Sequence, residues 1–159
     1  LVGFWLPAWQ PRLKVRERAA PKFYFFDPGI ARAAAGRLRA PLHEVERGPL
    51  LETWVLHELR SHLAWHPLGG ELSYYRTGAG VEVDFIWQGP TAQVGIEVKA
   101  SPRWRPEHGA ALKELVARGA IQRAVAVYEG ASAQQDGPIR VLPVQEFCTD
   151  LGQILGSQE

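Results

Sequence analysis

Methionine is absent from the 159 residues, and cysteine occurs once, at Cys148. The single cysteine excludes an intramolecular disulfide and a zinc site of several thiolates, as expected for a protein of the reducing cytoplasm. No apolar run approaches the roughly 20 residues that a membrane-spanning helix needs, and the run 1–6 is too short for the core of a signal peptide. The sequence therefore predicts a soluble, cytoplasmic protein with no membrane partner.

Charge is balanced over the whole chain, at +1, but it is unevenly distributed. Residues 1–47 contain nine Lys or Arg and four Asp or Glu, a local net charge of +5, which leaves −4 for the rest of the chain. The first 21 residues show no helical period, and the chain begins with Leu1 rather than methionine. We therefore interpret 1–21 as a basic arm, the tail of a segment that connects to a missing upstream region, and 22–159 as one domain.

The first half of the chain predicts one strand and two helices. Residues 22–26 are typical of a strand, and Asp27 followed by Pro28 marks the start of a short helix that should end at Gly36. In 48–66, leucine and valine recur at every fourth position, as an amphipathic helix requires.

The pattern then changes to the period of β-strands. Residues 72–76 and 81–88 predict a hairpin closed by the glycine-bearing turn 77–80, and a third strand is expected at 93–100. The remaining predicted elements are a helix at 107–118, strands at 121–128 and 139–144, and a C-terminal helix that carries Phe147, Leu151 and Leu155. This order predicts a mixed α/β fold.

Charged residues on the second and third of these strands form a candidate site. Alternation along the third strand places Glu97 and Lys99 on the same face, and Asp84 has the parity that lets it meet Glu97 from the neighbouring strand. Two adjacent carboxylates repel each other unless a proton or a cation lies between them, and Mg²⁺ prefers such oxygen ligands. Lys99 could orient an attacking water, and Glu52, from helix 48–66, could supply one more oxygen.

A purely structural explanation is also open for each of these residues. Asp84, Glu97 and Lys99 can form an ion-pair cluster on a solvated face of the sheet. Glu52 is expected in the first turn of helix 48–66, where the helix dipole favours a carboxylate without any metal.

Four blocks of the sequence, taken in order, resemble the uncharacterised C-terminal domain found on many bacterial and archaeal AAA+-type ATPases, within the PD-(D/E)XK nuclease superfamily. The blocks are KFYFFDPGIA (22–31), GPLLETWVLHEL (48–59), YYRTGAGVEVDF (74–85) and IEVKAS (96–101). The resemblance implies a restriction-endonuclease-like core, in which a central mixed β-sheet is flanked by helices. Its elements would be a helix, a three-stranded β-meander, a second helix and a strand.

The resemblance also implies a site and a neighbour. The metal-site positions of the superfamily correspond to Glu52, Asp84, Glu97 and Lys99, although Val83 stands where the superfamily often has proline before the aspartate. Members of the family carry a P-loop ATPase. Because no Gly-x-x-x-x-Gly-Lys-Ser/Thr motif occurs in this chain, we expect that ATPase domain upstream of Leu1.

These observations predict a DNA endonuclease that depends on Mg²⁺ or Mn²⁺ and hydrolyses phosphodiester bonds. Asp84 and Glu97 would hold the metal with support from Glu52, and Lys99 would position water. Phosphate contacts are expected from Arg76 at the hairpin and from Arg103 and Arg105, which flank Trp104 directly after the third strand.

Two other functions remain open. The chain can be an inactive nuclease-fold module that binds DNA or regulates the attached ATPase. It can also be a domain for docking or self-association that forms a homo-oligomer through the basic arm and Trp104.

Overall fold

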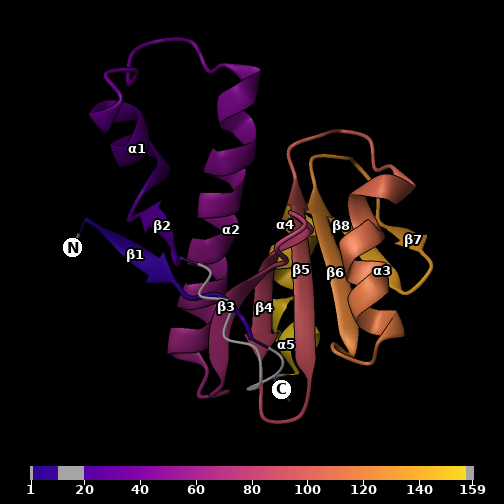
Figure 1. Cartoon of the computed structure of the whole chain (residues 1–159). Helices are drawn as coiled ribbons and strands as arrows, with labels where there is room; N and C mark the ends of the chain where they lie inside the picture. The colour runs from indigo at the N-terminus through magenta and orange to yellow at the C-terminus, as the bar shows by residue number, and fades with distance from the viewer. Residues whose placement is uncertain (1, 11–19, 157–159) are drawn as a thin grey trace.

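The computed structural model describes residues 2–10 and 20–156, and Figure 1 shows how its elements are arranged. The strands are β1 (Gly3–Leu6), β2 (Lys22–Phe25), β3 (Glu71–Arg76), β4 (Glu82–Gln88), β5 (Gln93–Lys99), β6 (Arg123–Tyr128), β7 (Gln134–Asp136) and β8 (Ile139–Pro143). The helices are α1 (Pro28–Ala34), α2 (Glu44–Trp65), α3 (Ala110–Ala117), α4 (Val144–Thr149) and α5 (Leu151–Leu155), and a 3₁₀ turn at Pro106–Gly109 leads into α3. None of the helices in this part of the chain is long and apolar enough to cross a lipid bilayer.

Six strands form one mixed sheet in the order β3-β4-β5-β6-β8-β7. The first three strands form an antiparallel meander, β5, β6 and β8 run parallel, and β7 is antiparallel to β8. The parallel step from β5 to β6 requires a crossover, which α3 provides. The prediction of an α/β fold with helices flanking a central mixed sheet is confirmed. In addition, α2, β3–β5, α3 and β6 follow one another in the order that the family resemblance implies.

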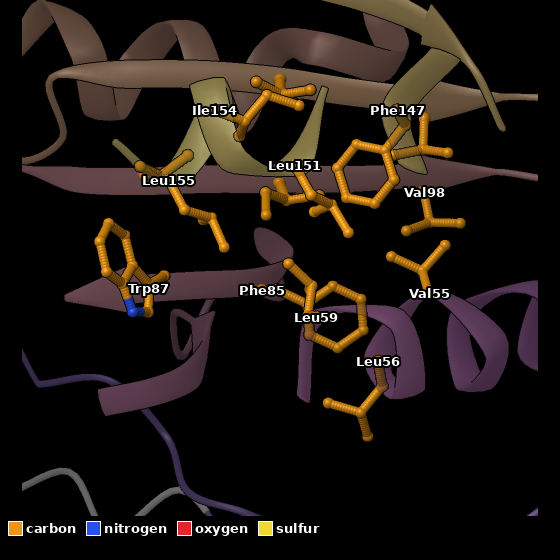
Figure 2. Close-up of a cluster of buried hydrophobic side chains, with 14 of the residues drawn as sticks. Val55, Leu56, Leu59, Phe85, Trp87, Val98, Phe147, Leu151, Ile154 and Leu155 are labelled. Atoms are coloured by element: carbon orange, nitrogen blue, oxygen red, sulfur yellow. The ribbon is translucent and has the colours of Figure 1, made fainter. Parts of the chain in front are cut away.

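Helices cover both faces of the sheet, and each face has its own apolar core. On one face, Val55 and Leu59 of α2 pack with Phe85 of β4 and Leu151 of α5 (Figure 2). On the other face, α3, which carries the buried Leu112, packs against β4, β5 and β6. The central strand β5 is therefore buried on both of its faces from Val94 to Val98.

Helix α2 begins at Glu44, one turn before the predicted start at residue 48. The sequence pair Gly48-Pro49 resembles a helix start, but the start is made upstream, where the Glu46 side chain accepts a hydrogen bond of 3.0 Å from the His43 backbone N–H. Glu52 consequently lies in the third turn of α2, and the expectation that it lies in the first turn is wrong. The helix dipole acts mainly on the terminal turn, so it does not explain a carboxylate at this position.

Other elements differ from the sequence expectations in smaller ways. Strands 22–26 and 72–76, the hairpin and the short helix after Asp27 are confirmed within one or two residues. The C-terminal helix is divided into α4 and α5 at Asp150, whose carboxylate pairs with Arg140 at 2.8 Å. Strands β1 and β7 were not predicted, because each is short and lacks a clear alternation of apolar residues.

The N-terminal segment forms a two-stranded ribbon that docks on the main sheet. Strand β1 pairs antiparallel with β2 and places Leu6 opposite Lys22. Tyr74 of β3 then anchors the chain that follows β1, since its N–H donates to the Pro7 carbonyl (3.0 Å) and its carbonyl accepts from the Trp9 N–H (2.6 Å). Residues 11–19, which hold the four basic residues of the predicted arm 1–21, lie outside the described residues.

Candidate functional site

The structure brings Asp84 and Glu97 together on neighbouring strands. Strands β4 and β5 pair antiparallel with Phe85 opposite Ile96, and one further step of this register places Asp84 opposite Glu97. The Val98 N–H donates a hydrogen bond of 2.8 Å to Asp84 Oδ2, which fixes that carboxylate against β5. The relative exposure of Asp84 is 9% and that of Glu97 is 5%, so these residues do not form an ion-pair cluster on a solvated face.

One of the two carboxylate oxygens of Glu97 has a partner among the described residues, and the other has none. One oxygen, Oε1, forms a close ion pair with Lys99 Nζ. The other oxygen, Oε2, is buried and has no hydrogen-bond partner within residues 2–10 and 20–156. A buried acceptor without a partner is unusual and costly in a folded protein. It marks a position where an additional donor or cation would be favourable.

Packing is close on the α3 side of the sheet near Glu97. Gly95, two residues before Glu97 on the same face, lies against α3 and the residues just before β6. A Cβ at this position would lie 2.7 Å from Leu112 Cδ2 and 2.7 Å from Ile121 Cδ1. The glycine therefore permits a close approach that a larger residue would prevent.

The proximity of these charges shifts their pKa values. Burial raises the pKa of Asp84, and the negative charges of Glu97 and Glu52 raise it further. Burial also raises the pKa of Glu97, although Lys99 partly offsets the shift. Burial lowers the pKa of Lys99, but the carboxylates of Glu97 and Asp84 outweigh burial and leave that pKa raised. The pair of carboxylates thus favours a bound proton or cation, whereas Lys99 stays charged at neutral pH.

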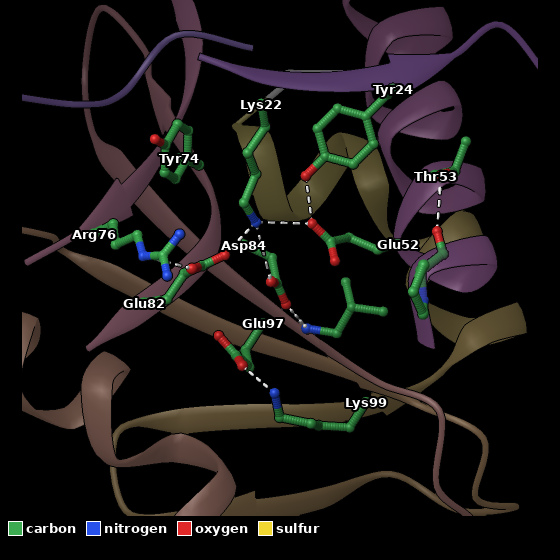
Figure 3. Close-up of polar contacts among 12 residues, drawn as sticks. Lys22, Tyr24, Glu52, Thr53, Tyr74, Arg76, Glu82, Asp84, Glu97 and Lys99 are labelled. Atoms are coloured by element: carbon green, nitrogen blue, oxygen red, sulfur yellow. Dashed lines mark hydrogen bonds and ion pairs between the residues drawn. The ribbon is translucent and has the colours of Figure 1, made fainter. Parts of the chain in front are cut away.

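Glu52 reaches the same region from α2, but it faces two residues of β2 (Figure 3). Its Oε1 accepts a hydrogen bond of 3.0 Å from Lys22 Nζ and a short one from the Tyr24 hydroxyl. Lys22 also forms a close ion pair with Glu82, and its Nζ lies 3.9 Å from Asp84 Oδ1. Lys22 therefore connects the predicted site residues Glu52 and Asp84.

Sequence reasoning did not identify Lys22 and Tyr24 as site residues. Alternation along β2 places both on the side opposite Phe23 and Phe25, and this parity is the signal that could have indicated a shared polar face. Burial lowers the pKa of Lys22, but Glu52, Glu82 and Asp84 together leave it raised. Burial and the nearby carboxylates, Glu52 first among them, raise the pKa of Tyr24, so its hydroxyl stays protonated and donates.

A family model for a domain of unknown function, DUF4143, matches residues 47–147. The match covers more than half of the chain. This chain belongs to the DUF4143 family. The matched residues include Glu52, Asp84, Glu97 and Lys99 but begin after Lys22. No curated protein and no solved structure matches the chain.

Two carboxylates of the DUF4143 domain could hold a divalent metal. Asp84 and Glu97 supply the hard oxygen atoms that Mg²⁺ prefers, and the unpartnered Glu97 Oε2 fits this use. Within the described residues, no three His, Cys, Asp or Glu side chains are already arranged around one metal position. Mg²⁺ often binds through one or two carboxylates, with waters and substrate phosphates as its other ligands. The pair therefore fits one such ion.

The three arginines expected to contact phosphate lie on exposed parts of the DUF4143 domain. Arg76 ends β3, and its Nε lies 3.4 Å from Glu82 Oε2. Arg103 and Arg105 are exposed on the segment that follows β5, the strand that ends with Lys99. Trp104, between them, is partly buried, and its indole N–H donates a hydrogen bond of 2.9 Å to Asp136 Oδ2.

Proposed function

We propose that this domain is a metal-dependent nuclease of the PD-(D/E)XK type that hydrolyses phosphodiester bonds in DNA. The observation that carries the proposal is the buried pair Asp84 and Glu97, in which Glu97 Oε2 has no partner among the described residues and Lys99 is adjacent. These two residues would hold Mg²⁺ or Mn²⁺. Glu52, expected to support the metal, adjoins them through Lys22.

The residues of the chain suit hydrolysis by a positioned water. Hydrolysis forms one bond from a water oxygen to phosphorus and breaks the bond to the leaving sugar oxygen, which gains a proton. The positive charge of Lys99 lies beside Glu97, where it would donate to the attacking water or to a phosphoryl oxygen as negative charge develops. Because the pKa of Lys99 is raised, Lys99 acts as a donor rather than as a base. A bound divalent ion would supply Lewis acidity.

Exposed arginines support DNA as the substrate. Arg103 and Arg105 follow the strand that carries Glu97 and Lys99, so a duplex whose phosphate approaches the site would pass these cations. Arg76 lies at the hairpin next to Glu82. These contacts would position the DNA backbone without reading its sequence.

The family also supports an ATPase as a partner in the same protein. DUF4143 is associated with the C-terminal regions of AAA-type ATPases. We therefore propose that this domain acts on DNA together with an ATPase domain, which would supply movement along the nucleic acid or remodelling of it.

A second candidate function is a nuclease-fold module without catalysis. The observation that favours it is the ammonium of Lys22, which already neutralises part of the carboxylate cluster. Such a module would bind DNA or regulate the ATPase, and it would bind no divalent ion at Asp84 and Glu97.

Cleavage of plasmid and branched DNA tests the proposed function. The experiment uses the chain joined to the proposed ATPase region, with Mg²⁺, with Mn²⁺, or with a chelator. We expect cleavage that requires the metal and that falls by about 100-fold or more in Asp84→Asn, Glu97→Gln and Lys99→Met, since each change removes a group that acts on the reacting phosphate. The matched control is Lys113→Met, which removes a lysine that pairs with Asp136 away from the site. Undiminished cleavage by the three site variants would overturn the mechanism.

A further inference from the structure

Lys22 lies among three carboxylates, one from α2 and two from β4. Its Nζ is 3.0 Å from Glu52 Oε1 of α2 and 3.9 Å from Asp84 Oδ1, and it forms a close pair with Glu82 Oε1 at the start of β4. Figure 3 shows the Lys22 side chain extending from β2 toward these oxygens. The side chain retains 22% of its exposure, so this ammonium is largely shielded from water.

Specific contacts hold Lys22 in this position. The hydroxyl of Tyr74 donates a hydrogen bond of 2.5 Å to the Ala20 carbonyl, two residues before Lys22. The Tyr74 ring also lies 5.1 Å from the Lys22 ammonium, within the range of a cation–π interaction. On the other side, β1 fixes the register of β2 by pairing Leu6 with Lys22. The ribbon of β1 and β2 thus carries a cation to the edge of the main sheet.

The carboxylates around Lys22 need a positive charge. Glu52, Glu82 and Asp84 would repel one another in a partly buried space without one, and divalent ions neutralise such clusters in many proteins. Arg76 pairs with Glu82, at 3.4 Å. Asp84 lies next to both groups. One of its oxygens faces Lys22, and the other accepts a hydrogen bond from β5, the strand that carries Glu97 and Lys99.

We propose that Lys22 is a built-in cation at this site. Its ammonium occupies the position among Glu52, Glu82 and Asp84 that a second divalent ion would otherwise take, and the domain therefore binds one ion, at Asp84 and Glu97, rather than two. Glu52 acts as a positioning residue that holds Lys22 and Tyr24. The inference rests on the proposed function, because it assumes that the Asp84–Glu97 pair is the metal site.

Titration with Mn²⁺ tests this assignment. Calorimetry on the protein gives the number of Mn²⁺ ions per chain, and the Mn²⁺-dependent rise in Tm gives an independent measure of binding. We expect one ion for the wild type and two for Lys22→Met, together with a larger Mn²⁺-dependent rise in Tm. Lys113→Met is the matched control, because Lys113 pairs with one carboxylate, Asp136 (2.6 Å), and should leave both values unchanged. Equal stoichiometry and equal Tm rise in the wild type and Lys22→Met would overturn the proposal.

A second experiment works without metal and keeps the test decisive where Lys22→Met folds poorly. Chemical unfolding with a chelator present compares Lys22→Gln, Glu52→Gln and the double variant. We expect Glu52→Gln to destabilise the wild type and to stabilise the Lys22→Gln background, because there it removes an unpaired negative charge. Additive effects of the two substitutions would overturn the role of Lys22.

The two proposals fail in different ways. If the wild type binds no Mn²⁺, the proposed metal site at Asp84 and Glu97 is wrong, whatever the unfolding experiment shows. If the wild type binds one ion and the substitutions at Lys22 and Glu52 are additive, the nuclease proposal stands and the built-in cation is wrong.

Discussion

Asp84 and Glu97 lie side by side at the junction of β4 and β5, one step beyond the pair Phe85 and Ile96, and both carboxylates are almost fully buried. Burying two like charges together costs stability unless something compensates for it. Lys99 compensates for part of the charge, but it contacts only one oxygen of Glu97. A stabilising role in the fold therefore does not explain this pair, and we propose a metal site instead.

The first prediction concerns the stability cost of Asp84. We expect Asp84→Asn to stabilise the metal-free protein at pH 8, because burial and the neighbouring carboxylates raise the pKa of Asp84 and the fold holds its charge at a cost. The substitution removes the repulsion with Glu97 and keeps an oxygen that can accept from the Val98 N–H. Urea unfolding with a chelator present measures the change.

Asp136→Asn is the matched control for Asp84→Asn. The pKa of Asp136 is lowered by hydrogen bonds from Lys113 and Trp104, so its charge stabilises the fold. We expect the control to lose stability. A loss of stability in both variants would contradict the claim that the Asp84 carboxylate is held at a cost.

The second prediction is a pH dependence with a defined sign. The pKa values of Asp84 and Glu97 are raised in the folded state. Their contribution to stability is therefore fully present below the unfolded values, near pH 4, and is lost as the pH rises through the raised values. Relative to Asp84→Asn/Glu97→Gln, metal-free wild type should lose stability as the pH rises from 4 to 8. The measurement is the difference in Tm between the two proteins at each pH.

The divalent ion should reverse this trend, because it binds the deprotonated carboxylates. We expect the rise in Tm caused by 10-fold increments of Mg²⁺ to be larger at pH 8 than at pH 5 in the wild type and absent in the double variant. A rise in Tm that is independent of pH would place the ion elsewhere.

The third prediction concerns the core that positions Glu52. Leu59 of α2 is fully buried between the helix and the sheet, so Leu59→Ala should destabilise the protein by about 2–5 kcal/mol through lost burial and a cavity. Val45→Ala, on the same helix at a side chain that is 81% exposed, should change stability by less than about 0.5 kcal/mol. Denaturant unfolding measures both. Similar small effects in the two variants would contradict the docking of α2 on the sheet.

The fourth prediction concerns DNA contacts by Arg103 and Arg105. If both bind phosphates, the double variant Arg103→Gln/Arg105→Gln should weaken binding to unrelated sequences equally and reduce the salt slope of log K by about 2. The measurement is fluorescence anisotropy with labelled duplexes at several salt concentrations. Arg118→Gln, an exposed arginine that pairs with Glu114 at the end of α3, is the control and should have little effect. An unchanged salt slope in the double variant would show that these arginines do not contact DNA phosphates.

The meeting of Asp84 and Glu97 could be predicted from the sequence because it depends on local rules. Strand parity decides which side each residue faces, and the short connection between β4 and β5 fixes their register. The same rules gave the antiparallel hairpin of β3 and β4. Sequence position was enough to predict these contacts, since the interacting residues are close in sequence.

Lys22 could not be assigned to the site in this way. It lies 30 residues before Glu52 and reaches it only because β1 and Tyr74 dock β2 beside α2. This docking depends on contacts between segments that are distant in sequence, which local periodicity does not report. The predicted start of α2 was wrong for a different reason: Gly48 and Pro49 resemble a helix start but lie inside a longer helix.

Calorimetric titration of wild type and Glu97→Gln with Mn²⁺ at pH 8 tests the central claim most directly. Glu97 Oε2 has no partner among the described residues, and we propose that it binds a divalent ion. We predict one Mn²⁺ per chain for the wild type and at least a 10-fold weaker affinity for Glu97→Gln, with the folded state intact by circular dichroism. Equal affinity for the two proteins, or no binding to either, would contradict the account.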